Sequence, residues 1–190
     1  MKLKLIGISG TNGAGKDTVG ELLAKQHNYL FVSGSDMLRD EARRRNLPVE
    51  REVLSMISAE WRREYNLGIL IDKCVDFYNA QKGEFAGLVI ASLRNPGEAD
   101  RVHELGGRVV WVDADPKIRY NRIFSRQRSA EDSKTFEQFV AEEKAEMTHS
   151  GDEATLNMAA VKDRADLTLI NDGGDIEQLN QIIENDLIKS

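Results

Sequence analysis

The sequence predicts an α/β fold, a three-layer, doubly wound sandwich around a five-stranded parallel sheet. Short apolar runs alternate with helical patterns along the 190 residues. Most of these runs are continuously apolar, which is typical of parallel strands buried on both faces. Strands that alternate with helices in this way form doubly wound sheets. The length suits one core, so we expect residues 1–190 to form a single domain.

The predicted strands are the apolar runs, and the predicted helices lie between them. In chain order the strands are Leu3–Ile8, Tyr29–Val32, Gly87–Ala91, Arg108–Val112 and Asp166–Ile170. The helices are Lys16–His27, Ser35–Arg45, Val49–Asn66, Gly68–Lys82, Pro96–Leu105, Pro116–Arg126, Thr135–Thr148 and Asp175–Ile188. Two polar stretches, 128–134 and 149–164, are expected to be irregular loops, where mobile binding segments usually lie.

The composition of the chain argues against proteins that bind nucleic acids or membranes. The net charge of -6, with scattered basic residues, provides no general attraction to nucleic acid, so we expect no nucleic-acid partner. The lone Cys74 suits a reducing compartment and lies between apolar residues, as a buried thiol would. No run is long enough to span a membrane, and the apolar N-terminus is too short for a signal peptide. We expect a cytoplasmic protein without a membrane partner; its oligomeric state is left open.

The most informative motif follows the first predicted strand. Residues 10–18 read Gly-Thr-Asn-Gly-Ala-Gly-Lys-Asp-Thr. The glycines let successive backbone N–H groups point at phosphate oxygens, and the helix that begins near Gly15 adds its positive dipole end. Lys16 supplies a mobile charge for the β- and γ-phosphates of a nucleotide. We therefore predict that the nucleotide is bound by Asn12, Gly13, Ala14, Gly15, Lys16, Asp17 and Thr18.

The loop departs from the common phosphate-loop pattern at one position. The pattern has Ser or Thr directly after the lysine, whereas this chain has Asp17 followed by Thr18. An acid beside the phosphates would repel them unless Mg²⁺ or an ordered water lies between. Two interpretations of Asp17 stay open: it acts on the water shell of the metal, or it only suits the helix dipole.

Ligands of open α/β sheets bind outside the carboxyl ends of the strands, so the residues after each strand are the next candidates. Behind the second to fifth strands come Ser33–Arg39, Ser92–Arg94, Asp113–Asp115 and Asn171–Gly174. Asn171 and Gly173 are predicted to present backbone groups to adenine, because glycine allows close approach. A plain strand-to-helix turn capped by Asp175 explains the same residues.

In this order, behind Gly13–Thr18, the segments resemble the layout of the adenylate-kinase-like nucleoside monophosphate kinases. The resemblance implies ATP as donor, an acceptor-binding helical region over 34–82 and a short lid over 126–135. It implies that Arg39 and Arg94 grip the acceptor phosphate and that Arg122 and Arg126 face the donor. The chain is also similar to a group of archaeal kinase-like proteins and, over 165–173, to dephospho-CoA kinases.

The chain departs from this family at the end of the third strand. The family normally has an acid followed by glycine there, whereas this chain has Ala91 and Ser92. Either Asp17, Asp36 or Asp113 then holds Mg²⁺, directly or through water, or the site is catalytically weak. The lid is shorter than in some relatives, and without a cysteine cluster no structural zinc is expected.

Phosphoryl transfer requires in-line positioning and positive charge on the phosphate oxygens. Arginine suits this because its planar fork holds two oxygens and stays charged. We predict a clamp of Arg39 and Arg94 on the acceptor side, with Arg126 and Arg128 on the donor side. Surface ion pairing is the competing interpretation for each of these arginines. The predicted catalytic residues are Lys16, Asp36, Arg94, Arg126 and Arg128.

These residues favour an ATP- and Mg²⁺-dependent kinase acting on a nucleoside monophosphate or a closely related nucleotide. The alternative is a dephospho-CoA kinase, whose hydroxyl acceptor benefits from a carboxylate base, for which Asp36 is the candidate. A third hypothesis, from another class, is an ATP-binding regulatory module without transferase activity. The absent acid at Ala91 is the feature that keeps this third hypothesis open.

Overall fold

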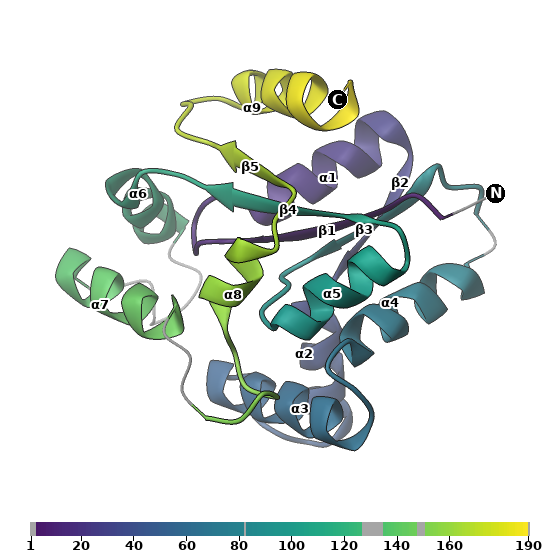
Figure 1. Cartoon of the computed structure of the whole chain (residues 1–190). Helices are drawn as coiled ribbons and strands as arrows, with labels where there is room; N and C mark the ends of the chain where they lie inside the picture. Colours follow the sequence, from purple (N-terminus) through teal and green to yellow (C-terminus); the bar gives the residue numbers. More distant parts are fainter. Residues whose placement is uncertain (1–2, 82, 127–134, 148–150, 190) are drawn as a thin grey trace.

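The structure, a computed structural model, describes residues 3–81, 83–126, 135–147 and 151–189. Its centre is a five-stranded sheet in the order β2-β3-β1-β4-β5, with every neighbouring pair parallel (Figure 1). The strands are β1 (Leu5–Gly10), β2 (Tyr29–Ser33), β3 (Gly87–Ala91), β4 (Arg108–Asp113) and β5 (Leu167–Ile170). The predicted five-stranded parallel sheet is therefore confirmed.

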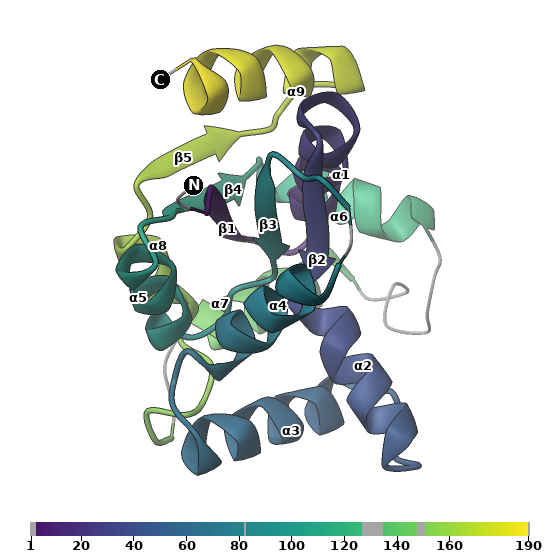
Figure 2. The same cartoon turned by 90° about the vertical axis from the view of Figure 1, so that its right-hand side faces the viewer.

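Helices cover both faces of the sheet, and further helices extend beyond it (Figures 1 and 2). The helices are α1 (Lys16–His27), α2 (Gly34–Arg44), α3 (Arg51–Glu64), α4 (Ile69–Ala80), α5 (Pro96–Glu104), α6 (Pro116–Arg126), α7 (Phe136–Met147), α8 (Met158–Asp163) and α9 (Ile176–Ile182). A π-helical stretch, η2 (Ile183–Ile188), continues α9. Within the described residues, no helix combines the length and the apolar character needed to cross a membrane.

Successive side chains of the buried strands point to opposite faces of the sheet and contribute to two separate hydrophobic cores. Ile6 and Ile8 pack with α1, α9 and η2 on one face, whereas Leu5 packs with α4, α5 and α8 on the other. A third cluster, which includes Trp61, joins α2, α3 and α4. Trp111 is fully buried within β4, and Trp61 is 7% exposed, so both tryptophans are packing residues. The continuous apolar runs of the sequence thus reflect burial on both sides.

The structure differs from the predicted elements at several boundaries, such as both ends of α3, and in one predicted loop. The first strand begins and ends two residues later than expected and runs directly into the phosphate loop. The stretch 149–164, expected to be irregular, contains α8, which Asn157 caps by accepting a hydrogen bond from the Ala160 N–H at 3.0 Å. Most of the predicted lid, 127–134, lies outside the described residues. The structure thus positions the sheet and its helices but carries no test of a lid.

Candidate active site

The phosphate loop leaves the central strand at Gly10. This glycine has φ +142°, and a Cβ there would lie 1.9 Å from the carbonyl oxygen of Val112 on β4, so no other residue fits. Gly13 and Gly15 also have positive φ values, +79° and +99°. Gly15 is the N-cap of α1 and has no side chain to bond the first helical N–H groups. The loop therefore has the backbone shape and the open helix end of a phosphate cradle.

Lys16 lies at the start of α1, with its ammonium group folded back over the loop. Its Nζ donates a 2.8 Å hydrogen bond to the Thr11 carbonyl oxygen. Burial and, to a lesser extent, the positive charge of Arg94 lower the pKa of Lys16 to about 8, against the opposing effect of Asp17. A bound anion would favour the protonated form again. Above pH 8, where the free lysine is mostly neutral, phosphate binding would therefore be coupled to the uptake of a proton.

Asp113, at the end of β4, forms a hydrogen bond with the phosphate loop. Asp113 accepts a 2.8 Å hydrogen bond from the Thr11 hydroxyl and a 2.9 Å bond from the Ala114 N–H, both at Oδ1. Lys162 on α8 lies 3.7 Å from its other oxygen. Asp113 was one of three candidates for the metal, and the structure shows it engaged in holding Thr11.

Arg119 on α6 is a loop-supporting residue that the sequence analysis missed. Only 2% of its side chain is exposed, and its guanidinium donates to the carbonyl oxygens of Ala114, at 2.7 Å, and Asn12, at 3.3 Å. Glu143 on α7 accepts from both terminal nitrogens of Arg119, and Phe139 packs over the guanidinium. The helices that flank residues 127–134 are therefore tied to the phosphate loop through one arginine.

Three of the predicted donor-side residues meet at the end of β5. The Asn171 side chain is buried and donates a 2.7 Å hydrogen bond to the Ala14 carbonyl oxygen. A Cβ on Gly15 would lie 2.7 Å from the same Asn171 nitrogen. Arg122 donates a 2.9 Å hydrogen bond to the carbonyl oxygen of Gly173. The side chain of Asn171 thus holds the loop, a role distinct from the adenine contact predicted for its backbone.

A cavity of about 640 Å³ connects the phosphate loop with α2, α3 and the β3–α5 turn. Its lining includes the loop residues Asn12, Lys16 and Asp17 and four arginines, Arg39, Arg51, Arg62 and Arg94. Two of these arginines, Arg39 and Arg94, were predicted as acceptor ligands from the sequence. The cavity therefore brings the phosphate loop together with the two arginines predicted for the acceptor side.

Asp36 and Arg39 lie one turn apart on α2 and form an ion pair of 2.5 Å. Both side chains are exposed, Asp36 by 66% and Arg39 by 42%. Arg39 lines the cavity together with its neighbour Ser35. The Asp36 N–H donates to the Ser33 hydroxyl, which caps the helix at the end of β2.

The cavity-lining Arg62 belongs to a buried ion pair. Arg62 on α3 and Glu98 on α5 are 1% and 2% exposed, with Arg62 Nη2 2.6 Å from Glu98 Oε1. The other Glu98 oxygen accepts hydrogen bonds from the backbone N–H groups of Arg94, at 2.7 Å, and Asn95, at 3.2 Å. The pair thereby connects α3 to the turn that carries Arg94.

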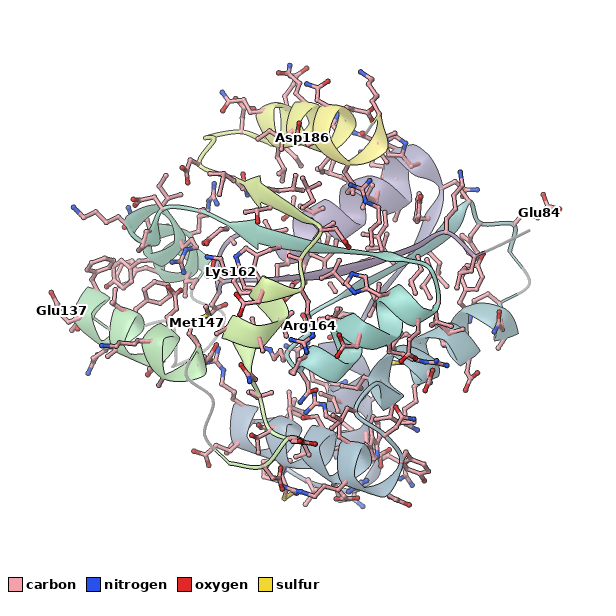
Figure 3. All side chains as sticks on the ribbon, viewed as in Figure 1. Glu84, Glu137, Met147, Lys162, Arg164 and Asp186 are labelled. Carbon is pink, nitrogen blue, oxygen red and sulfur yellow. The ribbon has the colours of Figure 1, made fainter. Side chains whose placement is uncertain are left out.

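Arg94 also points toward α7. Its Nη1 lies 3.3 Å from one carboxylate oxygen of Glu146, and Arg51 Nη1 lies 2.5 Å from the other. Met147, labelled in Figure 3, is the residue after Glu146 and marks the end of α7 beside α8. Neither Arg51 nor Glu146 was predicted, because nothing local in the sequence indicates that they meet.

Within the described ranges, no three His, Cys, Asp or Glu side chains gather into a metal site. Of the other two candidates for the metal, Asp17 lines the cavity, whereas Asp36 pairs with Arg39. Ser92, which follows the position of the missing acid, lines the cavity with φ +74°, a conformation rarely adopted by serine. Arg128 lies outside the described residues, and of Arg126 only the backbone, at the end of α6, is described.

Comparison with known families agrees with this geometry. The sequence model of the AAA_18 family, described as an AAA domain, matches residues 6–148. The chain belongs to the AAA_18 family. The match covers the phosphate loop, the cavity-lining arginines and α7, whereas Asn171 and Gly173 lie beyond it.

This AAA_18 chain is also similar to archaeal proteins of the UPF0200 group. It is 31% identical over 149 residues to a UPF0200 protein of Methanothermobacter thermautotrophicus, covering 77% of this chain and 74% of that protein. It is 28% identical over 189 residues to one of Pyrobaculum aerophilum, covering 98% of both chains. The predicted similarity to a group of archaeal proteins is confirmed.

The solved structures similar to the AAA_18 chain identify its fold. A shikimate kinase of Bacteroides thetaiotaomicron superimposes with a TM-score of 0.60 at 15% identity, over 95% of this chain and 94% of that one. A shikimate kinase of Acinetobacter baumannii in complex with shikimate gives 0.58 at 15% identity, over 96% and 91%. TT1252 from Thermus thermophilus gives 0.59 at 19% identity, over 96% and 93%. The chain has the P-loop kinase fold.

Proposed function

We propose that the protein transfers a phosphoryl group from ATP, with Mg²⁺, to a nucleoside monophosphate or a closely related nucleotide. The observation that carries this proposal is the cavity that joins Lys16 of the phosphate loop to Arg39 and Arg94. A kinase of this kind needs a triphosphate and a second anion held end to end, with cations around both. The lining of the cavity provides these cations at both ends.

The loop suits a triphosphate tail on structural grounds. Gly13 and Gly15 have positive φ values and no side chains that would block access to the backbone of the loop. No side chain caps the N-terminus of α1, which begins directly after Gly15. Asn171, Asp113 and Arg119 hold the loop from three directions. Such preorganisation lets the backbone N–H groups bind phosphate oxygens without rearrangement. We retain Arg122, Arg126 and Arg128 as donor-side residues of the proposal.

We assign the metal first to Asp17, since this carboxylate lines the cavity directly after Lys16. Mg²⁺ keeps several waters and is usually held by one or two carboxylates together with the phosphates of the substrate. When bound, it would supply positive charge to the phosphate oxygens. Asp36 is the second candidate and is paired with Arg39. The absence of the usual acid at Ala91 makes Asp17 the residue to test.

The alternative acceptor is a sugar hydroxyl, as in a dephospho-CoA kinase. Asp36 favours this alternative because it lies in the first turn of α2, beside the cavity-lining Ser35. A hydroxyl must lose a proton during transfer, whereas a phosphate oxygen is already an anion. Replacing Asp36 by Asn therefore separates the two acceptors, with Asp40→Asn as the matched control one turn along the same helix.

The experiment is an assay of ADP formation from ATP and Mg²⁺ with a panel of nucleoside monophosphates and dephospho-CoA. We expect ADP to form only when a monophosphate is present, to vanish in Lys16→Ala, and to persist in Asp36→Asn. Activity with dephospho-CoA alone, lost in Asp36→Asn but kept in Asp40→Asn, would establish the hydroxyl acceptor instead. Binding of ATP without acceptor-dependent ADP would establish the binding module.

A further inference from the structure

We propose that Arg51 and Arg94 form the subsite for the anionic group of the acceptor, and that Glu146 of α7 occupies this subsite until the acceptor displaces it. This inference rests on the proposed function and adds to it two residues, Arg51 and Glu146, together with the chemistry of the acceptor. The acceptor must carry a compact anion, such as a phosphate, that accepts hydrogen bonds from two guanidinium groups.

The contacts around Glu146 have the geometry of a bound anion. Its Oε1 accepts from Arg51 Nη1 at 2.5 Å, and its Oε2 lies 3.3 Å from Arg94 Nη1. Arg51 begins α3 and Arg94 follows β3, so the two arginines approach the carboxylate from separate elements. Both arginines line the cavity that contains Lys16. A single planar anion thus binds both guanidinium groups, as a phosphate would.

The position of Glu146 relative to the phosphate loop also supports the inference. Its negative charge acts to raise the pKa of Lys16, whereas the charge of Arg94 acts to lower it. Both groups are therefore close enough to the ammonium group to influence its protonation. An anion in place of Glu146 would lie beside the end of the triphosphate site, where an acceptor must lie for in-line transfer.

The exchange is favourable because the incoming group carries more charge. A phosphate monoester has a charge of about −1.5 to −2 near neutral pH and three acceptor oxygens, whereas Glu146 has one negative charge and two oxygens. The Glu146 side chain is 22% exposed, so water can solvate it once it is released. A neutral acceptor, which makes no charged contact with Arg51 or Arg94, would not displace it. Glu146 would therefore select for charged acceptors.

The test measures the binding of inorganic phosphate by calorimetry while the phosphate loop is filled with Mg²⁺ and a non-hydrolysable ATP analogue. We expect Glu146→Gln to tighten phosphate binding roughly tenfold, because the competing charge is gone while the side-chain shape stays. Arg51→Gln should weaken binding by roughly tenfold or more. Glu52→Gln, next to Arg51 but exposed and outside the cavity lining, removes the same charge and should leave the dissociation constant unchanged.

The outcomes separate the inference from the proposed function. Failure of the ATP analogue to bind contradicts the proposed function. The subsite can then still be tested by titrating phosphate without the analogue into proteins that carry Lys16→Ala, alone and combined with Glu146→Gln or Arg51→Gln. Equal phosphate affinity in the parent, Glu146→Gln and Arg51→Gln overturns the inference even when the analogue binds. Far-ultraviolet circular dichroism of each variant confirms that the helices remain folded.

Discussion

The Asn171 side chain donates a 2.7 Å hydrogen bond to the carbonyl oxygen of Ala14, which ties the end of the last strand to the middle of the phosphate loop. The two residues are 157 positions apart in sequence. Both are buried, so water cannot readily replace either partner. The loop is thus held in shape by a residue that need not touch the nucleotide.

Asn171→Ala should weaken the binding of an ATP analogue by roughly tenfold and lower the free energy of unfolding by about 1–2 kcal/mol, because the Ala14 carbonyl loses its donor. Calorimetric titration and urea denaturation measure the two effects. Asn79→Ala, at an exposed position on α4, is the control and should change neither value. Unchanged affinity in Asn171→Ala would show that the loop keeps its shape without this bond.

Nucleotide affinity should fall as the pH rises through about 8, the lowered pKa of Lys16. Above this pH the free protein loses the ammonium charge, and binding must take up a proton to restore it. We expect a roughly tenfold loss of affinity between pH 7 and pH 9. Lys16→Arg stays charged over this range and should lack the loss. Affinity of the parent that is independent of pH would contradict the prediction.

The same pKa has the opposite consequence for stability. Between pH 8 and 10.5 the unfolded chain binds a proton at Lys16 that the folded chain has released. The contribution of Lys16 to the free energy of unfolding should therefore increase with pH across this window. Urea denaturation of the parent and of Lys16→Ala, compared at pH 7.5 and pH 10, isolates this contribution as the difference between the two proteins. A difference that stays constant between the two pH values would refute it.

Ser92→Gly should raise the free energy of unfolding by roughly 1 kcal/mol, since glycine adopts a positive φ without the steric cost that serine has. Ser92 has φ +74° in the turn after β3. Ser92→Ala keeps the strained conformation and serves as the control, with an expected change below about 0.5 kcal/mol. Equal stability of both variants, measured in urea, would argue against strain at this position.

Cys74 should resist thiol reagents at pH 8 in the folded protein. Burial and, to a lesser extent, the negative charge of Glu98 raise its pKa to about 12, and the thiol packs 3.3 Å from the sulfur of Met37. Mass spectrometry after treatment with a disulfide reagent should show labelling only after urea is added. Rapid, complete labelling of protein that retains its native circular dichroism would contradict this prediction.

The sheet and most helices could be predicted because their signals are local. The run Gly87–Ala91 is apolar at every position, and the structure places a strand there with the same bounds. Helix α8 was missed because its six residues are too few to show a period, although Asn157 is a recognisable cap. The phosphate loop is local as well: three glycines and a lysine within seven residues specify its shape.

The rest of the site depends on contacts between residues far apart in the chain. Arg51 and Glu146 are 95 positions apart, and Arg119 meets a loop residue 107 positions away. No local pattern tells a cavity-facing arginine from a solvated one. Arg62 is an exception in principle, because it follows Trp61 on the buried face of α3, where a charge requires a partner.

The ion pair between Arg62 and Glu98 has a consequence for how this family can diverge. Loss of either residue alone leaves an unpaired charge in the interior, which destabilises the fold. Joint replacement by apolar residues of similar volume removes both charges at once. Selection should therefore accept changes at these two positions mainly as pairs. In a relative that keeps only one of them, some other residue must have taken over the missing half of the pair.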